Sequence, residues 1–320
     1  MTVPAPTPII LDCDPGHDDA IAMLLAWGSP AIDLIGVTTV AGNQTLSKVS
    51  NNALSVARVA GMTGVPFAAG CAVPIVRPLE VAAAVHGESG LDGPKLPEPK
   101  ESLDKRHAVD LIIDLVFARP AGEVTLVATG PLTNIALAFR REPRLPAHVR
   151  EVVLMGGGIE GGNWTPCAEF NIAVDPEAAE IVFAAGWKVT MVGLDVTHRA
   201  LATEEVKRRI AAVGTKPAKF VNELLEFFGK AYLDHQGFTA PPVHDVCAVA
   251  RVIDQTIIKA VQAPITVETQ GKYTTGMTIV DLRYQAAKKD CKTYAANDID
   301  TDKFWALVID ALERIGDPEL

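Results

Sequence analysis

The sequence lacks the features of disulfide-rich, zinc-binding and membrane proteins. Its five cysteines are widely spaced and form no C-x-x-C pair, which argues against a disulfide framework or a zinc ribbon and favours reduced thiols in a cytoplasmic protein. No apolar run approaches the roughly 20 residues of a membrane helix. Residues 1–6 contain no basic segment followed by an apolar run, so we expect neither a signal peptide there nor a membrane partner.

Dense clusters of lysine and arginine are also missing. The formal net charge is −10, whereas a nucleic-acid surface needs a basic stripe, so no nucleic-acid partner is expected. An acidic protein suits a neutral small substrate better than a polyanion, unless a metal ion bridges the two. With 48% hydrophobic and 21% charged residues in a chain of 320, the composition is ordinary for a globular protein with a substantial core.

Short apolar runs alternate with helical patterns along the chain. The predicted strands are residues 9–11, 34–40, 65–69, 124–128, 152–155 and 189–192. The predicted helices are residues 20–27, 46–60, 108–117, 132–140, 176–184, 218–231 and 302–315. Such βα units predict an α/β fold with a mostly parallel open sheet, a Rossmann-like core, and helices on both faces.

No repeat, low-complexity tract or linker divides the chain, so we expect a single domain over residues 1–320. Residues 71–102 are rich in glycine and proline and predict a long functional or mobile loop. In an open parallel sheet the ligand site lies beyond the carboxyl ends of the strands, and the functional residues are therefore expected there.

Four aspartates occur within eight residues directly after the first predicted strand. They are Asp12, Asp14, Asp18 and Asp19. At neutral pH they repel one another, so some must be protonated, paired or bound to a metal ion. The Pro-Gly pair at 15–16 can turn the chain and bring Asp14 and Asp19 towards one point. Capping of the following helix explains Asp18, but it does not explain Asp12 and Asp14 at the end of a buried strand.

Carboxylate ligands select a hard cation, Ca²⁺ or Mg²⁺. An EF-hand is excluded because the twelfth residue counted from Asp12 is Met23, where a bidentate glutamate is required. A magnesium-dependent phosphohydrolase that uses Asp12 and Asp14 is an alternative. Its Asp-x-Asp-x-Thr pattern is not complete here, because Gly16 stands where the threonine would be.

Residues 12–20, Asp-Cys-Asp-Pro-Gly-His-Asp-Asp-Ala, resemble the N-terminal signature of the inosine–uridine-preferring nucleoside hydrolase family. Further motifs similar to that family follow in order at residues 40–43 (Val-Ala-Gly-Asn), 128–134 (Ala-Thr-Gly-Pro-Leu-Thr-Asn), 155–158 (Met-Gly-Gly-Gly), 168–171 (Ala-Glu-Phe-Asn), 243–245 (Val-His-Asp) and 275–278 (Thr-Gly-Met-Thr). The resemblance implies an enzyme that hydrolyses the N-glycosidic bond of ribonucleosides, such as inosine and uridine, to ribose and a free base. A third interpretation is a non-catalytic protein that binds calcium or a nucleoside.

The resemblance also implies a metal ion and the roles of particular residues. Ca²⁺ would be held by the carboxylates of Asp14, Asp19 and Asp245 and by the backbone carbonyl of Thr129. Asp14 would be the general base on a water bound to that ion, and His244 would protonate the departing base. The presence of His244 resembles the branch of the family that accepts both purine and pyrimidine nucleosides.

Substrate-binding residues are implied in the same way. The residues around the ribose would be Asp14, Asn43, Met155, Asn163, Glu169, Asn171 and Asp245. His86 and Tyr232 match positions near the base, on segments thought to be mobile in the family. Members of the family are commonly dimers or tetramers, which implies a homodimer or a homotetramer.

The chemistry of N-ribosyl cleavage explains why such residues are needed. Breaking the bond builds positive charge on the ribose, in a transition state that resembles an oxocarbenium ion, and carboxylate and amide oxygens stabilise that charge. A bound cation acidifies the attacking water, and a general base removes its proton. The leaving base carries negative charge until an acid protonates it.

Two other patterns have simpler explanations. Residues 156–161, Gly-Gly-Gly-Ile-Glu-Gly, fit G-x-G-x-x-G, but the next residues cannot begin a helix to seat a pyrophosphate, so a dinucleotide site is not expected. Asp245 could cap a helix that begins near Val246, which is compatible with metal binding. Trp164, beside Asn163, is either a packing residue or a substrate contact. Cys13 should point away from the flanking aspartates into the sheet packing, and His17 is expected to be structural.

Overall fold

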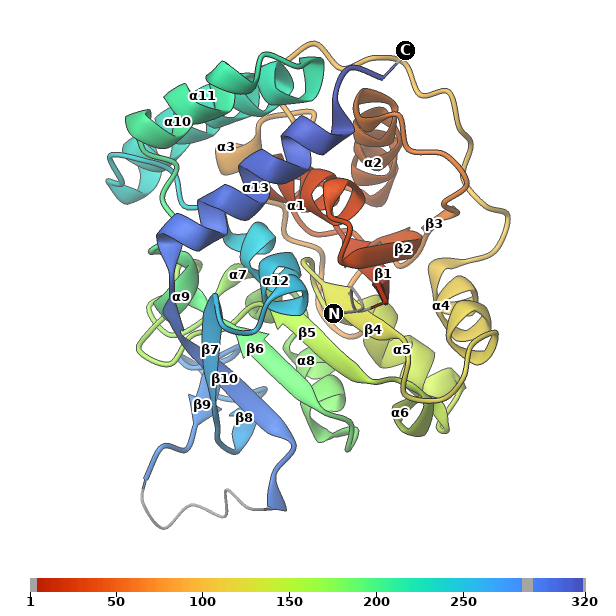
Figure 1. Cartoon of the computed structure of the whole chain (residues 1–320). Helices are drawn as coiled ribbons and strands as arrows, with labels where there is room; N and C mark the ends of the chain where they lie inside the picture. The colour runs from red at the N-terminus through yellow and green to blue at the C-terminus, as the bar shows by residue number, and fades with distance from the viewer. Residues whose placement is uncertain (1–4, 284–289, 319–320) are drawn as a thin grey trace.

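An eight-stranded sheet forms the centre of the molecule in the computed structural model, which describes residues 5–283 and 290–318 (Figure 1). The strand order is β3-β2-β1-β4-β5-β6-β10-β7. Their bounds are β1 Thr7–Cys13, β2 Ile32–Thr39, β3 Phe67–Ala69, β4 Thr125–Ala128, β5 Glu151–Met155, β6 Val189–Val192, β7 Ile258–Gln262 and β10 Thr293–Ile299. All neighbours pair in parallel except β10 and β7, which are antiparallel. The predicted mostly parallel α/β sheet is therefore confirmed.

Strand β1 is buried on both faces of the sheet because its side chains alternate between two hydrophobic cores. Ile9, Leu11 and Cys13 belong to one core, whereas Ile10 belongs to the other. A strand buried in this way needs a continuous apolar run, as parallel strands usually do. The expected inward packing of Cys13 is confirmed, and its thiol donates to the carbonyl of Thr38 at 3.6 Å.

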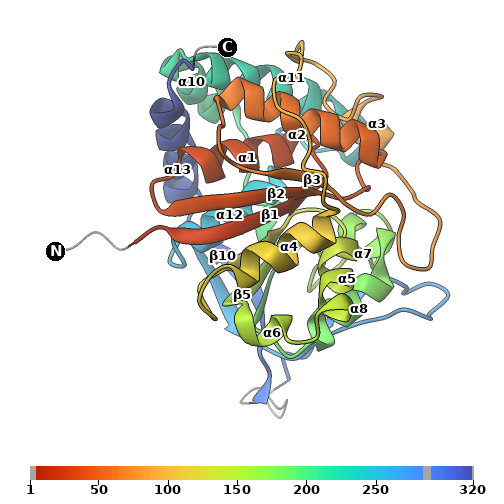
Figure 2. The ribbon, with the colours of Figure 1, turned by 90° about the vertical axis from the view of Figure 1, so that its right-hand side faces the viewer.

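Helices cover both faces of the sheet (Figure 2). On one face lie α1 His17–Gly28, α2 Leu46–Ala60, α10 Glu204–Val213, α11 Lys216–Gln236, α12 His244–Ile253 and α13 Thr301–Ile315. On the other lie α4 Ala108–Phe117, α5 Thr133–Arg141, α6 Leu145–His148 and α8 Pro176–Ala184. Shorter elements are α3 Ala83–His86, α7 Phe170–Val174, α9 Leu194–Thr197 and the hairpin of β8 Ile265–Val267 and β9 Thr278–Val280. Among the described residues, no helix has both the length and the apolar character to cross a membrane.

The strand order reverses between β1 and β4, the neighbours from which the chain winds in opposite directions. Loops leaving the carboxyl ends at such a point separate and open a crevice. Asp14 follows β1, Asn43 follows β2, Thr129 follows β4, and Met155 ends β5. The topology therefore brings residues from four separate motifs to one edge of the sheet.

Several predicted elements have the expected bounds, including α2, α4, α8 and β6. Strands β7 to β10 were not predicted, and the predicted loop at 71–102 contains the short helix α3. Helix α12 begins at His244, so Asp245 lies inside its first turn. The expectation that Asp245 caps a helix beginning near Val246 was therefore wrong in its boundary.

Candidate active site

A cavity of about 340 Å³, including its open mouth, lies at the carboxyl edge of the sheet. The lining residues are Asp18, Asn43, His86, Thr129, Met155, Asn163, Glu169, Phe170, Asn171, Tyr232, His244 and Asp245. The cavity is thus lined mainly by polar side chains from segments far apart in the sequence.

The loop between β1 and α1 is held by the carboxylate of Asp19. One oxygen, Oδ2, accepts the backbone N–H of Gly16 at 3.0 Å and the side-chain amide of Asn43 at 3.1 Å. The other, Oδ1, accepts the hydroxyl of Thr129 at 2.8 Å and the backbone N–H of Asp14 at 3.3 Å. Asp19 therefore accepts a backbone N–H group at the start of α1 and holds the loop against the residues that follow β2 and β4.

Asp14 lies directly behind the cavity wall and is fully buried. Its Oδ2 accepts the backbone N–H of Asn43 at 2.6 Å, whereas its Oδ1 has no hydrogen-bond partner. A Cβ atom added at Gly42 or at Gly130 would lie 2.2 Å or 2.6 Å from these carboxylate oxygens. Glycine at both positions is therefore what leaves room for the Asp14 side chain.

Asp18 joins two helix N-termini that are far apart in the sequence. It lies in the first turn of α1, but its Oδ2 accepts the backbone N–H groups of His244 at 3.0 Å and Asp245 at 3.4 Å, at the start of α12. We expected Asp18 to serve its own helix. Its hydrogen bonds instead satisfy the free N–H groups of α12 and fix Asp245 beside Asp19.

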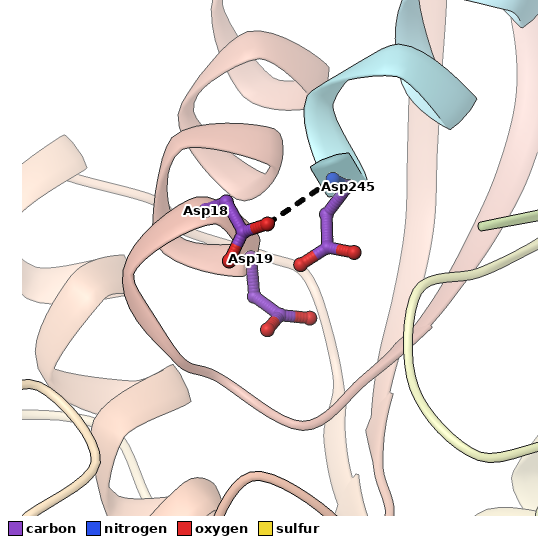
Figure 3. Close-up of side chains that lie close together, drawn as sticks. All are labelled: Asp18, Asp19 and Asp245. Carbon is purple, nitrogen blue, oxygen red and sulfur yellow. Dashed lines mark hydrogen bonds between the residues drawn. The ribbon is translucent and has the colours of Figure 1, made fainter. Parts of the chain in front are cut away.

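The three carboxyl groups of Asp18, Asp19 and Asp245 converge from these helix starts (Figure 3). One oxygen from each lies within 4.8 Å of the others, a spacing that could hold a metal ion. Burial raises the pKa of Asp14 and of Asp245 well above the usual value, and neighbouring carboxylates raise both pKa values further. Burial also raises the pKa of Asp18 to about 7.

This electrostatic arrangement fits a cation. Buried carboxylates without a nearby arginine or lysine repel one another, and either protons or a positive ion must relieve the repulsion. The unpartnered Oδ1 of Asp14 is an acceptor without a donor, and a buried acceptor of that kind has a free-energy cost unless a ligand uses it. An all-oxygen donor set is suited to Ca²⁺ or Mg²⁺.

A second group of side chains lines the opposite wall of the cavity. The amide of Asn171 donates to the carbonyls of Thr129 at 2.8 Å and Met155 at 3.1 Å. Glu169 accepts the backbone N–H groups of Gly157 and Ile172 through Oε2. Burial raises the pKa of Glu169 to about 7. These contacts fix carboxyl and amide oxygens at the cavity surface, as a hydroxyl-rich ligand requires.

His244 and Tyr232 form a hydrogen-bonded pair at the cavity. The Tyr232 hydroxyl is 2.7 Å from His244 Nε2, and the Thr197 hydroxyl is 2.8 Å from His244 Nδ1. Burial lowers the pKa of His244 to about 3, so the ring is neutral at neutral pH in the metal-free protein. Both Tyr232 and His244 line the cavity, so this hydrogen-bonded pair faces the ligand space.

His86 lies near His17 and packs against Phe228. The His86 and Phe228 rings stack at 5.4 Å between centroids, and Phe228 contacts Tyr232 at 4.7 Å. Burial lowers the pKa of His86 well below its usual value and lowers that of His17 to about 4. His86 therefore lies on the side of the cavity that also carries Tyr232.

Most of the residues that the sequence predicted for the site come together. The cavity wall contains Asn43, His86, Thr129, Met155, Asn163, Glu169, Asn171, Tyr232, His244 and Asp245, with Asp14 and Asp19 directly behind. Sequence reasoning missed Phe170 and the position of Asp18 at the cavity. Phe170 stands inside the recognised 168–171 motif, so its neighbours could have indicated it. Asp18 could not be placed without knowing its contact with α12.

Three other sequence features lie outside the cavity wall. Trp164 is 41% exposed, donates to Glu80 at 3.0 Å, packs edge-on against Phe170 and is not one of the residues that line the cavity. A contact between Trp164 and the substrate stays a prediction. Asp12 is fully buried and accepts from Thr38 at 2.5 Å and Asn134 at 2.8 Å. No helix follows the 156–161 glycines before α7, which confirms that a dinucleotide site is not formed there.

The fold and the site define an α/β enzyme that binds a polar small molecule at the carboxyl edge of its sheet, over a carboxylate cluster suited to a metal ion. Residues 9–306 match the model of the inosine-uridine preferring nucleoside hydrolases, and the chain belongs to that family. It is therefore an N-ribohydrolase that acts on ribonucleosides. The recognition made from the sequence motifs is confirmed.

Relatives with different substrate names resemble the chain. It is 56% identical over 315 residues to an inosine-uridine preferring nucleoside hydrolase of Leishmania major, covering 98% of this chain and 100% of the relative. It is 46% identical over 306 residues to a pyrimidine-specific ribonucleoside hydrolase, RihA, of Photobacterium profundum, covering 95% and 98%. A purine-preferring ribonucleoside hydrolase from Gardnerella vaginalis superposes with a TM-score of 0.90 at 32% identity, covering 96% and 98%.

These names differ in base preference, so membership of the family does not fix the preferred base. Membership does decide against the phosphohydrolase and the non-catalytic binding protein as alternatives. The structure agrees, because Asp12, which the phosphohydrolase would use together with Asp14, is enclosed by Thr38 and Asn134 and does not line the cavity.

Proposed function

We propose that the protein is a calcium-dependent nucleoside hydrolase that accepts both inosine and uridine and releases ribose and the free base. Two observations at the polar cavity carry this proposal together: the carboxylates of Asp18, Asp19 and Asp245 converge, and the buried Oδ1 of Asp14 has no partner among the described residues. Oxygen ligands and a cavity lined by carboxyl and amide groups together suit a hard cation and a ribose.

The proposed ligands of Ca²⁺ are the carboxylates of Asp14, Asp19 and Asp245 and the carbonyl of Thr129. This ligand set is the one that the family resemblance implies. Asp18 also belongs to the converging carboxylates, and we assign it a supporting role because its Oδ2 holds the start of α12 through two backbone N–H groups. A bound Ca²⁺ would acidify the attacking water and orient it and the ribose diol.

Asp14 is the proposed general base. Its Oδ2 is held by the Asn43 backbone, which leaves Oδ1 free to remove the proton of the attacking water. The ribose is held by Asn43, Asn163, Glu169, Asn171 and Asp245, with Met155 beside it, and their oxygens stabilise the positive charge that develops on the sugar.

His244 is the proposed general acid, and Tyr232 and His86 are proposed to lie near the base. A neutral imidazole can still donate its single proton when the leaving base becomes a strong acceptor, and Tyr232, 2.7 Å from Nε2, can relay it. Proton transfer helps purine and pyrimidine leaving groups alike, which supports a broad base preference.

A panel of nucleosides tests the proposed function directly. We expect turnover of both inosine and uridine, scored as reducing sugar and free base, and loss of that turnover after exhaustive chelation with EGTA, with recovery on adding Ca²⁺. Added Mg²⁺ is the matched control for the identity of the ion. Full activity in metal-stripped protein would refute the metal dependence. A uridine kcat/KM more than about a thousandfold below that of inosine would refute the broad preference.

Ribonucleosides are expected to be strongly preferred over 2′-deoxyribonucleosides. A site built to hold hydroxyl groups leaves buried polar atoms unpaired when a hydroxyl is missing, and discrimination can then reach about 10⁴-fold. The measurement is kcat/KM for inosine and for 2′-deoxyinosine at saturating Ca²⁺. Comparable kcat/KM values for the two nucleosides would mean that the carboxylates and the ion do not bind the ribose diol.

The metal-free protein is expected to lose stability as pH rises. The raised pKa values of Asp14, Asp18 and Asp245 mean that the folded state holds protons which the unfolded chain releases above its ordinary value of 3.8. The free energy of unfolding therefore falls as pH rises above 3.8, until each carboxyl reaches its folded pKa, which is about 7 for Asp18. Thermal melts at about pH 5 and about pH 8, with Ca²⁺ or with EGTA, should show the larger calcium-induced rise in Tm at the higher pH. Equal rises would contradict the cluster as the calcium site.

The resemblance also implies a homodimer or homotetramer, which stays a prediction. Light scattering of the purified protein would distinguish these two assemblies from a monomer.

A further inference from the structure

Two histidines from separate segments meet beside the cavity, and the proposed mechanism uses only one of them. His17 lies in the first turn of α1, and His86 ends α3. Their Nδ1 atoms are 3.1 Å apart, and His17 Nε2 is 2.9 Å from the carbonyl oxygen of Asp92. His86 lines the cavity, whereas His17 is fully buried behind it, with its ring stacked on Phe227 at 5.2 Å and Phe228 at 5.1 Å.

The carbonyl of Asp92 fixes the proton of His17. A carbonyl oxygen only accepts a hydrogen bond, so His17 Nε2 must carry hydrogen. Both rings are neutral, because they are buried and, in the part of the chain that the structure describes, neither ring hydrogen-bonds to a carboxylate. A neutral imidazole has a single N–H, and His17 Nδ1 is therefore an acceptor.

The assignment for His17 determines which ring nitrogen of His86 carries hydrogen. The contact between the two Nδ1 atoms needs one hydrogen, which must then be on Nδ1 of His86. The backbone N–H of His17 also approaches His86 Nδ1, at 3.3 Å. If that longer contact were the hydrogen bond, either two Nδ1 lone pairs would face each other at 3.1 Å, or His17 would have hydrogen on both ring nitrogens and a charge on a fully buried ring. We therefore assign the bond to the shorter contact.

The Nε2 atom of His86 is then left as an acceptor that no described protein group satisfies. It is absent from the fully enclosed unpartnered atoms, and His86 belongs to the cavity wall, so this lone pair is accessible from the ligand space. Phe228 links His86 to Tyr232, beside His244, where the base is proposed to lie. The chemical group that would donate a hydrogen bond to Nε2 is an N–H group, and uracil and hypoxanthine both carry one on a ring nitrogen.

We propose that His17 is a positioning residue that holds His86 in its Nδ1–H tautomer, so that His86 Nε2 accepts a hydrogen bond from an N–H of the nucleobase. This inference rests on the proposed function for the identity of the ligand. The tautomer itself does not depend on turnover. His17 would thereby set the preference of the cavity for donor-bearing bases without touching the substrate.

The tautomer can be measured directly on the whole protein. In ¹⁵N-labelled enzyme, two-bond ¹H–¹⁵N correlation spectra distinguish a protonated ring nitrogen from an unprotonated one. We expect His86 to show hydrogen on Nδ1 and none on Nε2, and His17 the reverse. Hydrogen on His86 Nε2 would overturn the proposal, and this readout holds even if the protein hydrolyses no nucleoside.

Two substitutions at His17 test its role in binding. His17→Leu keeps apolar bulk between Phe227 and Phe228 but removes the acceptor, and should raise KM for inosine about fivefold to tenfold with kcat changed less than about twofold. His17→Asn can place an oxygen near the Nδ1 position and should keep KM within about twofold of the parent. An unchanged KM in His17→Leu, or an equal rise in both variants, would overturn the positioning role. If His17→Leu does not fold, the tautomer spectrum of the parent still decides.

Discussion

Replacing Asp14 with asparagine is expected to reduce kcat/KM for inosine by at least about 10³-fold, because one change removes both the proposed general base and a proposed metal ligand. Asparagine has nearly the same shape, so the hydrogen bond from Asn43 to the retained side-chain oxygen can persist. Steady-state kinetics at saturating Ca²⁺, together with calcium titration by calorimetry, would separate the catalytic loss from the loss of affinity.

The matched control for this variant is Asp12→Asn. Asp12 lies two residues earlier, within β1, and is equally buried, but its Oδ1 accepts from Thr38 and Asn134, neither of which lines the cavity. The fall in kcat/KM for Asp12→Asn should be at least tenfold smaller than that for Asp14→Asn, because Asp12→Asn disrupts only about one hydrogen bond. Similar losses in both variants would mean that Asp14 acts through the stability of the fold and not as the base.

The His244→Ala variant is expected to lose about 10² to 10⁴-fold in kcat for inosine, the usual contribution of a general acid. A p-nitrophenyl riboside, whose leaving group departs as a stable anion, should be hydrolysed at close to the parent rate. This contrast between substrates is the decisive measurement, because a general loss of structure would slow both reactions. The exposed His235, at the end of α11, provides a control variant that should change neither rate.

Equal losses on both substrates would show that His244 does not donate the proton. In that case its contacts with Tyr232 and Thr197, at 2.7 and 2.8 Å, would be the only role left for it, and the proton would come from another group or from solvent. The two substrates therefore distinguish proton donation from simple positioning without requiring a structure of the variant.

The parallel part of the sheet was predictable because its strands are buried on both faces. Apolar runs such as those of β1 and β6, separated by amphipathic helices such as α2, produce the alternating pattern directly. Strands β7 and β10 were missed for the opposite reason. Strand β7 is an edge strand and is mostly only partly buried, and neither β7 nor β10, its antiparallel neighbour, shows a regular alternation of buried and exposed residues.

The candidate site was predictable wherever a local motif carried it. Asp14 and Asp19 stand in one short segment, and the 168–171 motif contains Glu169 and Asn171. The importance of Asp18 was not predictable, because it depends on hydrogen bonds to residues 226 and 227 positions away. His17 is a similar case, since its role depends on Asp92, which belongs to a glycine-rich stretch with no regular pattern of its own.

The hydrogen bonds between Asp18 and the start of α12 bear on the order in which the site forms during folding. Asp19 and Asp245 are separated by about seven-tenths of the chain, and Asp245 comes close to Asp19 only after α12 packs against α1. An isolated N-terminal fragment would therefore contain the motif at residues 12–20 but would lack Asp245, and it could not form the complete group of carboxylates. If the proposed Ca²⁺ binds only the folded protein, it would shift the folding equilibrium toward the state in which α12 is packed against α1, and ion binding would be one of the last steps of folding.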